Sequence, residues 1–140
     1  MNFLKPYLIS NKIDQETIKH ILNIYEEVAG MWDNLNNHIP FLSKLFLNLS
    51  QRYTREKLCN TFETWSNHIK SLKTVVTLLY DLNSYSKQKL YAYDHDTRLK
   101  ASAKINEEIH SQLDPLQLLP IIYNYLFFMN DDGKIFLKKI

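Results

Sequence analysis

The chain has 140 residues and a net charge of +2, and 45% of its residues are hydrophobic while 23% are charged. This composition excludes a disordered chain, and the length fits a single helical domain, residues 1–140, with a core of its own. Two glycines and four prolines are too few for a fold built on many tight turns, so long helices are favoured over an all-β fold.

Two helices are predicted in the first third of the chain. The first begins after Asp14, a favourable N-cap, and carries apolar residues on a seven-residue period until Pro40 ends it. A second helix starts at Pro40, because proline suits the first turn of a helix, and it runs to about Ser50. Residues 1–12 are expected to pack on the bundle as a short extended or single-turn segment.

The most regular pattern of the sequence lies in residues 58–79. Apolar residues follow one another there in alternating steps of four and three, which keeps them on one face of a helix and which a strand cannot use. They are Leu58, Phe62, Trp65, Ile69, Leu72, Val76 and Leu79. We predict one helix from a cap at Thr54 to about Asp81, with Trp65 in the core.

Two further helices are predicted in the remainder of the chain. Residues 87–113 are the least periodic, and Asp96 is the expected N-cap after an interruption near His95. Asp114 followed by Pro115 starts a helix that is apolar on nearly every side, as expected for a central position. An alternative stays open for residues 121–140, which also fit a β-hairpin. The predicted fold class is all-α, a compact bundle of about five helices.

No group of residues has the pattern of an active site. Glu107 and His110 are spaced to place two metal ligands on one helix face, but di-iron bundles need a second such pair. The acidic cluster at residues 94–96 suits a helix cap better than an ion site. Two glycines cannot form a phosphate-binding loop, and Cys59 is typical of a small buried hydrophobe. We expect no catalytic residue, no cofactor, no metal and no enzymatic activity.

Two segments interleave basic residues with tyrosines, within residues 50–104, where ten Lys and Arg face five Asp and Glu, a net charge of +5. Tyrosine is favoured at protein interfaces, so the partner-binding candidates are Tyr53, Tyr85, Tyr91 and Tyr93. Nucleic acid is the alternative ligand, since cations bind phosphates and rings stack on bases. The candidates are then Arg52, Arg55, Lys57, Lys87 and Lys89.

The predicted function is a non-catalytic helical protein-interaction module, such as an adaptor, a regulator or an assembly subunit, which binds itself or another protein. The alternative is a nucleic-acid-binding or packaging protein that uses residues 50–104. A single cysteine predicts a reducing, intracellular location, taken as the cytoplasm. The longest apolar run, residues 116–129, is interrupted by polar residues and proline and is too short to span a bilayer.

Overall fold

The computed structural model describes residues 14–109, 111 and 113–130. Over these residues the chain forms six α-helices and two 3₁₀ turns, without a β-strand. The helices are α2 (Gln15–Val28), α3 (Ile39–Asn48), α4 (Arg52–Ser66), α5 (Leu72–Leu82), α6 (His95–Ile109) and α7 (Pro115–Asn130), and the turns are η2 (Ala29–Met31) and η3 (Leu35–His38). The predicted all-α class is confirmed, although the sequence predicted about five helices.

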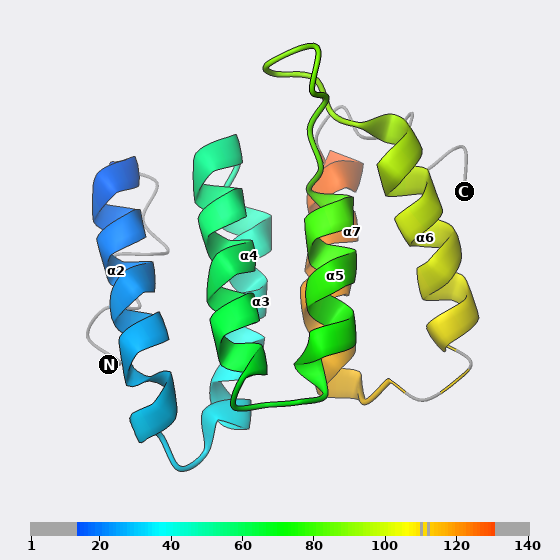
Figure 1. Cartoon of the computed structure of the whole chain (residues 1–140). Helices are drawn as coiled ribbons and strands as arrows, with labels where there is room; N and C mark the ends of the chain where they lie inside the picture. Colours follow the sequence, from blue (N-terminus) through cyan, green and yellow to red (C-terminus); the bar gives the residue numbers. More distant parts are fainter. Residues whose placement is uncertain (1–13, 110, 112, 131–140) are drawn as a thin grey trace.

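The helices form two layers (Figure 1). The front layer holds α2, α4, α5 and α6 in that order, and each of these helices packs on the next. Behind α4 and α5 lie α3 and α7, which make the most extensive helix pair of the described structure. None of the described helices has the length and apolar character needed to cross a bilayer.

The long helix predicted around residues 58–79 is broken in the structure. Helix α4 begins at Arg52 and ends at Ser66, and α5 begins at Leu72 after a turn closed by short-range backbone hydrogen bonds. The residues between them, Asn-His-Ile-Lys-Ser, include Asn and Ser, whose side chains compete with helical backbone bonds. The apolar pattern nevertheless continues across the break, because both helices turn the same face to one core.

Other helix ends correct or confirm the predictions. The first helix ends at Val28, and the two 3₁₀ turns follow it where the sequence predicted continued helix. Asp14 caps α2 as predicted, since its carboxylate accepts a 2.8 Å hydrogen bond from the amide of Thr17. The N-cap of α4 is Gln51 and not Thr54, which is buried and donates to the Gln51 carbonyl instead.

The start of α7 at Pro115 agrees with the prediction, and the helix extends to Asn130. Residues 121–130 are therefore helical, which removes the first strand of the alternative β-hairpin. Its second strand, and the lead predicted for residues 1–12, lie outside the described residues.

The core contains Trp65 and Cys59, both predicted to be buried. Trp65 is fully buried near the end of α4, and its indole nitrogen donates a 3.1 Å hydrogen bond to the carbonyl of Tyr25. Cys59 is buried on the same helix, and this burial raises the pKa of its thiol to about 12. The thiol is thus neutral at physiological pH and packs as a small hydrophobe.

Candidate interaction site

The connection between α5 and α6 forms a projecting loop, residues 83–94, which we call the bridge loop (Figure 1). Its two arms pair through an antiparallel bridge between Tyr85 and Tyr93. The amide of Ser86 donates to the carbonyl of Ala92 at 2.8 Å, and the amide of Asp94 donates to the carbonyl of Ser84 at 3.0 Å. These bonds give the base of the loop a defined strand-like geometry.

Asp94 ends the loop and caps α6, which corrects the predicted cap at Asp96. Its carboxylate accepts hydrogen bonds from the Thr97 amide at 3.1 Å and the Thr97 hydroxyl at 2.7 Å. These two bonds hold the pKa of the Asp94 carboxyl below its usual value. Helix α6 consequently begins at His95, two residues before the predicted start.

A buried arginine, Arg98, packs under the base of the bridge loop. Its guanidinium carbon lies 3.5 Å from the ring centre of Tyr93 and 4.1 Å from that of Phe128. Its Nε and Nη2 atoms have no hydrogen-bond partner among the described residues. Burial lowers the pKa of Arg98 to about 10, so the guanidinium keeps its charge at neutral pH.

A second buried arginine, Arg55 of α4, ties the loop to the helices behind it. Its Nη1 donates to the carbonyls of Phe46 and Leu49 at the end of α3, at 2.6 and 2.7 Å. Its Nε donates to Asn83 at 2.8 Å, and its Nη2 donates to Asn124 of α7 at 2.6 Å. One guanidinium therefore joins α3, α7 and the first residue of the bridge loop to α4.

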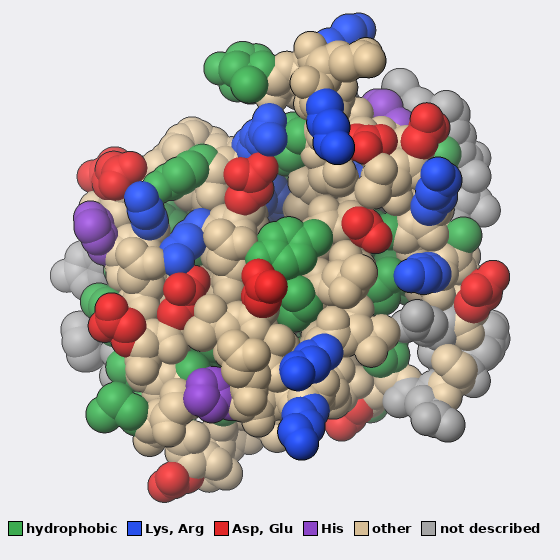
Figure 2. All heavy atoms as spheres, viewed as in Figure 1, with side chains coloured by type: hydrophobic (Ala, Val, Ile, Leu, Met, Phe, Trp, Pro, Cys, Tyr) green, Lys and Arg blue, Asp and Glu red, His purple; other side chains and the backbone are tan. Residues whose placement is uncertain are grey.

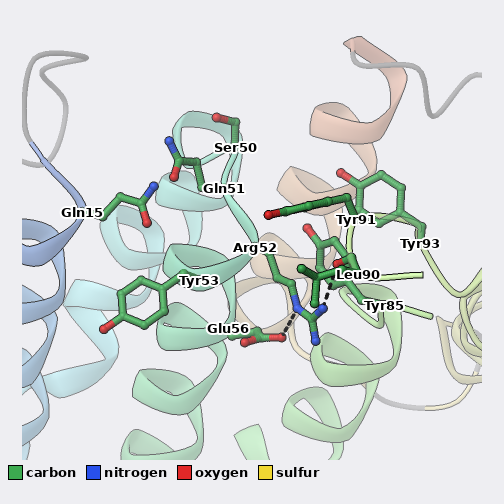
Figure 3. Close-up of a pocket in the computed structure, with 10 residues that line it drawn as sticks. All are labelled: Gln15, Ser50, Gln51, Arg52, Tyr53, Glu56, Tyr85, Leu90, Tyr91 and Tyr93. Carbon is green, nitrogen blue, oxygen red and sulfur yellow. Dashed lines mark hydrogen bonds and ion pairs between the residues drawn. The ribbon is translucent and has the colours of Figure 1, made fainter. Parts of the chain in front are cut away.

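A cavity of about 680 Å³ lies between the bridge loop, the first turns of α2 and α4, and the α3–α4 turn (Figure 3). Its volume falls within the range of ligand pockets in proteins. We call it the tyrosine pocket, and its lining residues are Gln15, Ser50, Gln51, Arg52, Tyr53, Glu56, Tyr85, Leu90, Tyr91 and Tyr93. All four tyrosines predicted as partner-binding residues line this one cavity, although they come from two separate segments.

The tip of the bridge loop exposes large apolar side chains at the mouth of the pocket. Tyr91 is 85% exposed and Leu90 is 67% exposed. Arg52 holds the tip in place, because its Nη1 donates a 3.0 Å hydrogen bond to the Leu90 carbonyl (Figure 3). The same guanidinium forms a 2.8 Å ion pair with Glu56 of α4. The exposed side chains thus stand on a loop that is fastened at both its base and its tip.

Cations of the protein itself cover three of the four tyrosine rings. Arg52 lies 4.6 Å from the ring centre of Tyr85, Arg98 lies under Tyr93, and Lys19 lies 5.4 Å from the ring centre of Tyr53. The rings of Tyr85 and Tyr93 also contact each other, with centres 5.0 Å apart. A nucleobase needs an open ring face for stacking, and each of these cations takes up one face of a ring.

The five nucleic-acid candidates are not all brought together on one surface, although Arg52 contacts the bridge loop that carries Lys87 and Lys89. Arg55 corrects that set, because it is fully buried and its guanidinium binds carbonyl oxygens inside the protein. Lys57 binds Glu26 at 2.7 Å, and Arg52 binds Glu56. Lys87 and Lys89 are exposed on the bridge loop. Phosphate binding by the whole set is therefore not supported by the arrangement of the side chains.

Sequence reasoning missed the buried polar residues that hold the site together. Asn124 was visible as a single amide inside the apolar run of residues 116–129, which is a signal for a buried hydrogen-bond partner. Ala101 follows Arg98 by three residues and Ile105 follows it by seven. This helical spacing places Arg98 on the same buried face of α6 as these two residues. The charge of the arginine concealed that signal, since charged residues are exposed by default.

No cluster of three or more potential metal ligands occurs among the residues that the structure describes. The Glu-x-x-His pattern ends at His110, which lies outside those residues, so the spacing noted in the sequence remains untested.

A family model described as "U3 small nucleolar RNA-associated protein 20, N-terminal" matches residues 1–139 of the chain. The U3 small nucleolar RNA-associated protein 20 of Saccharomyces cerevisiae is 25% identical over 131 residues, which are 91% of this chain and 5% of that protein. The protein of the same name from Schizosaccharomyces pombe is 24% identical over 102 residues, 73% of this chain and 4% of that protein. The chain thus spans a small part of these relatives. No solved structure matches it.

These similarities contradict the cytoplasmic location expected from the sequence. The family and both relatives are named for a small nucleolar RNA, which points to the nucleolus. The expectation rested on a single cysteine, and cytosolic and nuclear proteins are both kept in a reducing environment. Cysteine content therefore cannot distinguish a cytoplasmic from a nuclear location.

Proposed function

The chain belongs to the family of the N-terminal region of U3 small nucleolar RNA-associated protein 20, and from this premise we propose that it is a non-catalytic assembly module of a U3-containing particle in ribosome biogenesis. It acts in the nucleolus by binding a protein partner. The observation that carries the proposal is the bridge loop, which presents Leu90 and Tyr91 to solvent beside the tyrosine pocket.

The geometry of the loop supports a role in binding. Exposed apolar side chains gain free energy when a partner removes them from water, and tyrosine is enriched among the residues that dominate interfaces. A loop ordered before binding loses little conformational entropy on association. The bridge between Tyr85 and Tyr93 and the bond from Arg52 to Leu90 provide such ordering.

A protein partner fits the site better than RNA does. Three of the four tyrosine rings are covered by the protein's own cations, and two of the five candidate phosphate-binding residues are paired with carboxylates. An apolar side chain such as Leu90 at the tip cannot form a hydrogen bond or an ion pair with a phosphate backbone. It does contribute to the apolar centre of a protein interface.

The proposal is tested by capturing the tagged chain from cells of its own organism and measuring the U3 small nucleolar RNA that co-purifies. We expect enrichment of U3 RNA with the unmodified chain, and a loss of about tenfold or more with the double variant Leu90→Ser/Tyr91→Ser. Met31→Ser is the matched control, because Met31 is also a large exposed apolar residue but lies outside the pocket, at the opposite end of α2 from Gln15. This control should retain U3 RNA.

Equal recovery of U3 RNA by the double variant and the unmodified chain would show that the bridge loop is not the contact. Ribonuclease treatment before capture separates the kinds of partner. Proteins that remain bound after the RNA is digested support a protein contact, whereas binding of protein-free U3 RNA by the purified chain would make RNA the ligand.

A further inference from the structure

The lining of the tyrosine pocket combines apolar walls with a few polar groups. Leu90 and the tyrosine rings supply apolar surface, which favours a large apolar side chain as the occupant. Gln15 and Gln51 bring amide groups to the same cavity from the starts of α2 and α4 (Figure 3). An amide side chain both donates and accepts hydrogen bonds, as a peptide backbone does. The Gln51 side chain does not cap its own helix.

The bridge loop beside the pocket carries a surplus of positive charge, and Lys89 directly precedes the lining residue Leu90. Lys87 and Lys89 are exposed on the bridge loop, and Lys19 lies beside Tyr53. Figure 2 shows Lys and Arg side chains on and around this projecting loop, with Asp and Glu side chains beside those at its base. Glu56 binds Arg52 and Asp94 caps α6, while Glu16 interacts electrostatically with Lys19 and Asp96 is exposed in the first turn of α6. The surplus therefore comes mainly from Lys87 and Lys89.

A further cation lies beneath the floor of the pocket. Arg98 is buried directly under the ring of Tyr93, and no described carboxylate accepts a hydrogen bond from its Nε or Nη2. A charge under a floor of low dielectric is screened less than a charge in solvent, so its potential extends into the cavity. Arg52 contributes less, because it forms an ion pair with Glu56, and the nearby Asp94 carboxylate offsets part of the charge of Arg98.

We propose that the tyrosine pocket binds an acidic peptide segment of a protein partner. The segment is extended, places one large apolar side chain among the tyrosines, and sets Asp or Glu side chains against Lys87 and Lys89. The inference rests on the proposed function, for which it names the chemistry of the partner. Charge complementarity of this kind selects among partners and accelerates association more than it strengthens the final complex.

The test is a fluorescence anisotropy titration of the full 140-residue chain against three labelled probes. The first is an octapeptide with one Phe among Asp and Glu residues, the second its isosteric twin with Asn and Gln, and the third a single-stranded RNA octamer. We expect the acidic peptide to bind about tenfold more tightly than its neutral twin, as a few exposed charge pairs provide. This preference should shrink at about 0.5 M salt, where screening is strong.

Variants assign the preference to the bridge loop. Lys87→Gln/Lys89→Gln should remove most of the difference between the two peptides. Lys73→Gln should keep it, because Lys73 is also exposed but lies in the first turn of α5, whereas the bridge loop follows the last turn. Leu90→Ser/Tyr91→Ser should lower the affinity for both peptides to the same extent, since it removes apolar contact and no charge.

Equal affinity for the acidic and neutral peptides would overturn the proposal, and so would the absence of peptide binding at about 1 mM. Tighter binding of the RNA octamer than of the acidic peptide would also overturn it. If neither peptide binds while Leu90→Ser/Tyr91→Ser still abolishes co-purification of U3 RNA, only the proposal of an acidic peptide is wrong. If co-purification is unaffected as well, the proposed function fails with it.

Discussion

Arg55 binds two backbone carbonyls and two asparagine side chains in the interior of the protein. Replacement by Met keeps much of the volume but removes the donor from these oxygens, of which Asn124 Oδ1 keeps only its 2.9 Å bond from the Asn83 amide nitrogen. We expect Arg55→Met to lower the free energy of unfolding by about 3–5 kcal/mol. Lysine should restore little of this, since an ammonium cannot reproduce the planar geometry of a guanidinium. Urea unfolding followed by far-UV circular dichroism measures the change.

Arg52→Met is the control for this prediction, because Arg52 lies on the same helix in a partly exposed ion pair. It should cost less than about 1 kcal/mol. A similar small cost for Arg55→Met would show that water or a rearranged side chain readily replaces its hydrogen bonds.

Cys59 predicts a specific loss of stability at alkaline pH. The thiol ionises near its ordinary pKa of 9.0 in the unfolded chain, while burial raises the pKa in the folded chain to about 12. Between these values the unfolded state binds fewer protons, so stability falls as pH rises and is fully present below the lower value. From about pH 8 to about pH 10, the unmodified chain should lose about 1 kcal/mol more than Cys59→Ala.

Urea unfolding of both chains at the two pH values measures this difference, and the tyrosines contribute equally to both. Parallel losses in the two chains would mean that the thiol ionises in the folded state as it does in the unfolded state.

At the residue scale, the sequence predicted side chains with an unambiguous chemical preference. Trp65 and Cys59 are apolar residues on or beside a regular stripe, and both are buried as expected. Arg55 was placed on the surface because charge favours water, and nothing local reveals that four acceptors from distant segments surround it. The sequence pattern also could not predict that Tyr53 and Tyr91 line the same cavity, because this depends on how α4 and the bridge loop pack together.

At the element scale, the segment of residues 58–79 shows what periodicity can establish. Alternating steps of four and three identify the face that is buried, and this face is correct on both α4 and α5. The steps do not establish that the helix continues, because two helices folded back on each other present the same face to the shared core. The polar residues between Ser66 and Leu72 were the signal for the break.

The start of α6 provides a test at this scale. We expect Asp94→Ala to lower stability at neutral pH, because the Thr97 amide and hydroxyl lose their acceptor. Asp96→Ala should have a smaller effect, since Asp96 lies within the first turn and supplies only a favourable charge. Thermal unfolding of the three chains measures the order.

The pH dependence of the Asp94 effect has a definite sign. The pKa of its carboxyl is lowered in the folded chain, so the stabilisation is present above the ordinary value of 3.8 and is lost as pH falls through the folded value. The difference between the unmodified chain and Asp94→Ala should therefore decrease in acid. A larger effect for Asp96→Ala than for Asp94→Ala would return the cap to the predicted position.

At the scale of the whole molecule, composition and periodicity were sufficient to predict the fold class but not how the helices are arranged in space. Scarce glycine and proline, together with helical spacing, predicted an all-α protein, which the described residues confirm. The two-layer order depends on which apolar faces meet, and α7, which is apolar on nearly every side, gave no preference from its sequence. In the structure it packs on α3 and α5, behind the front layer (Figure 1).

The position of Arg55 has a consequence for how the molecule opens over time. Its guanidinium connects α3, α4, α7 and the end of α5, whereas α2 packs mainly on α4 and α6 mainly on α5. Amide hydrogens of α2 and α6 should therefore exchange with deuterium through partial opening, and those of α4 and α7 only through global unfolding. Exchange measured by mass spectrometry should show this order. Uniform protection of all six helices would instead describe a molecule that opens in a single step.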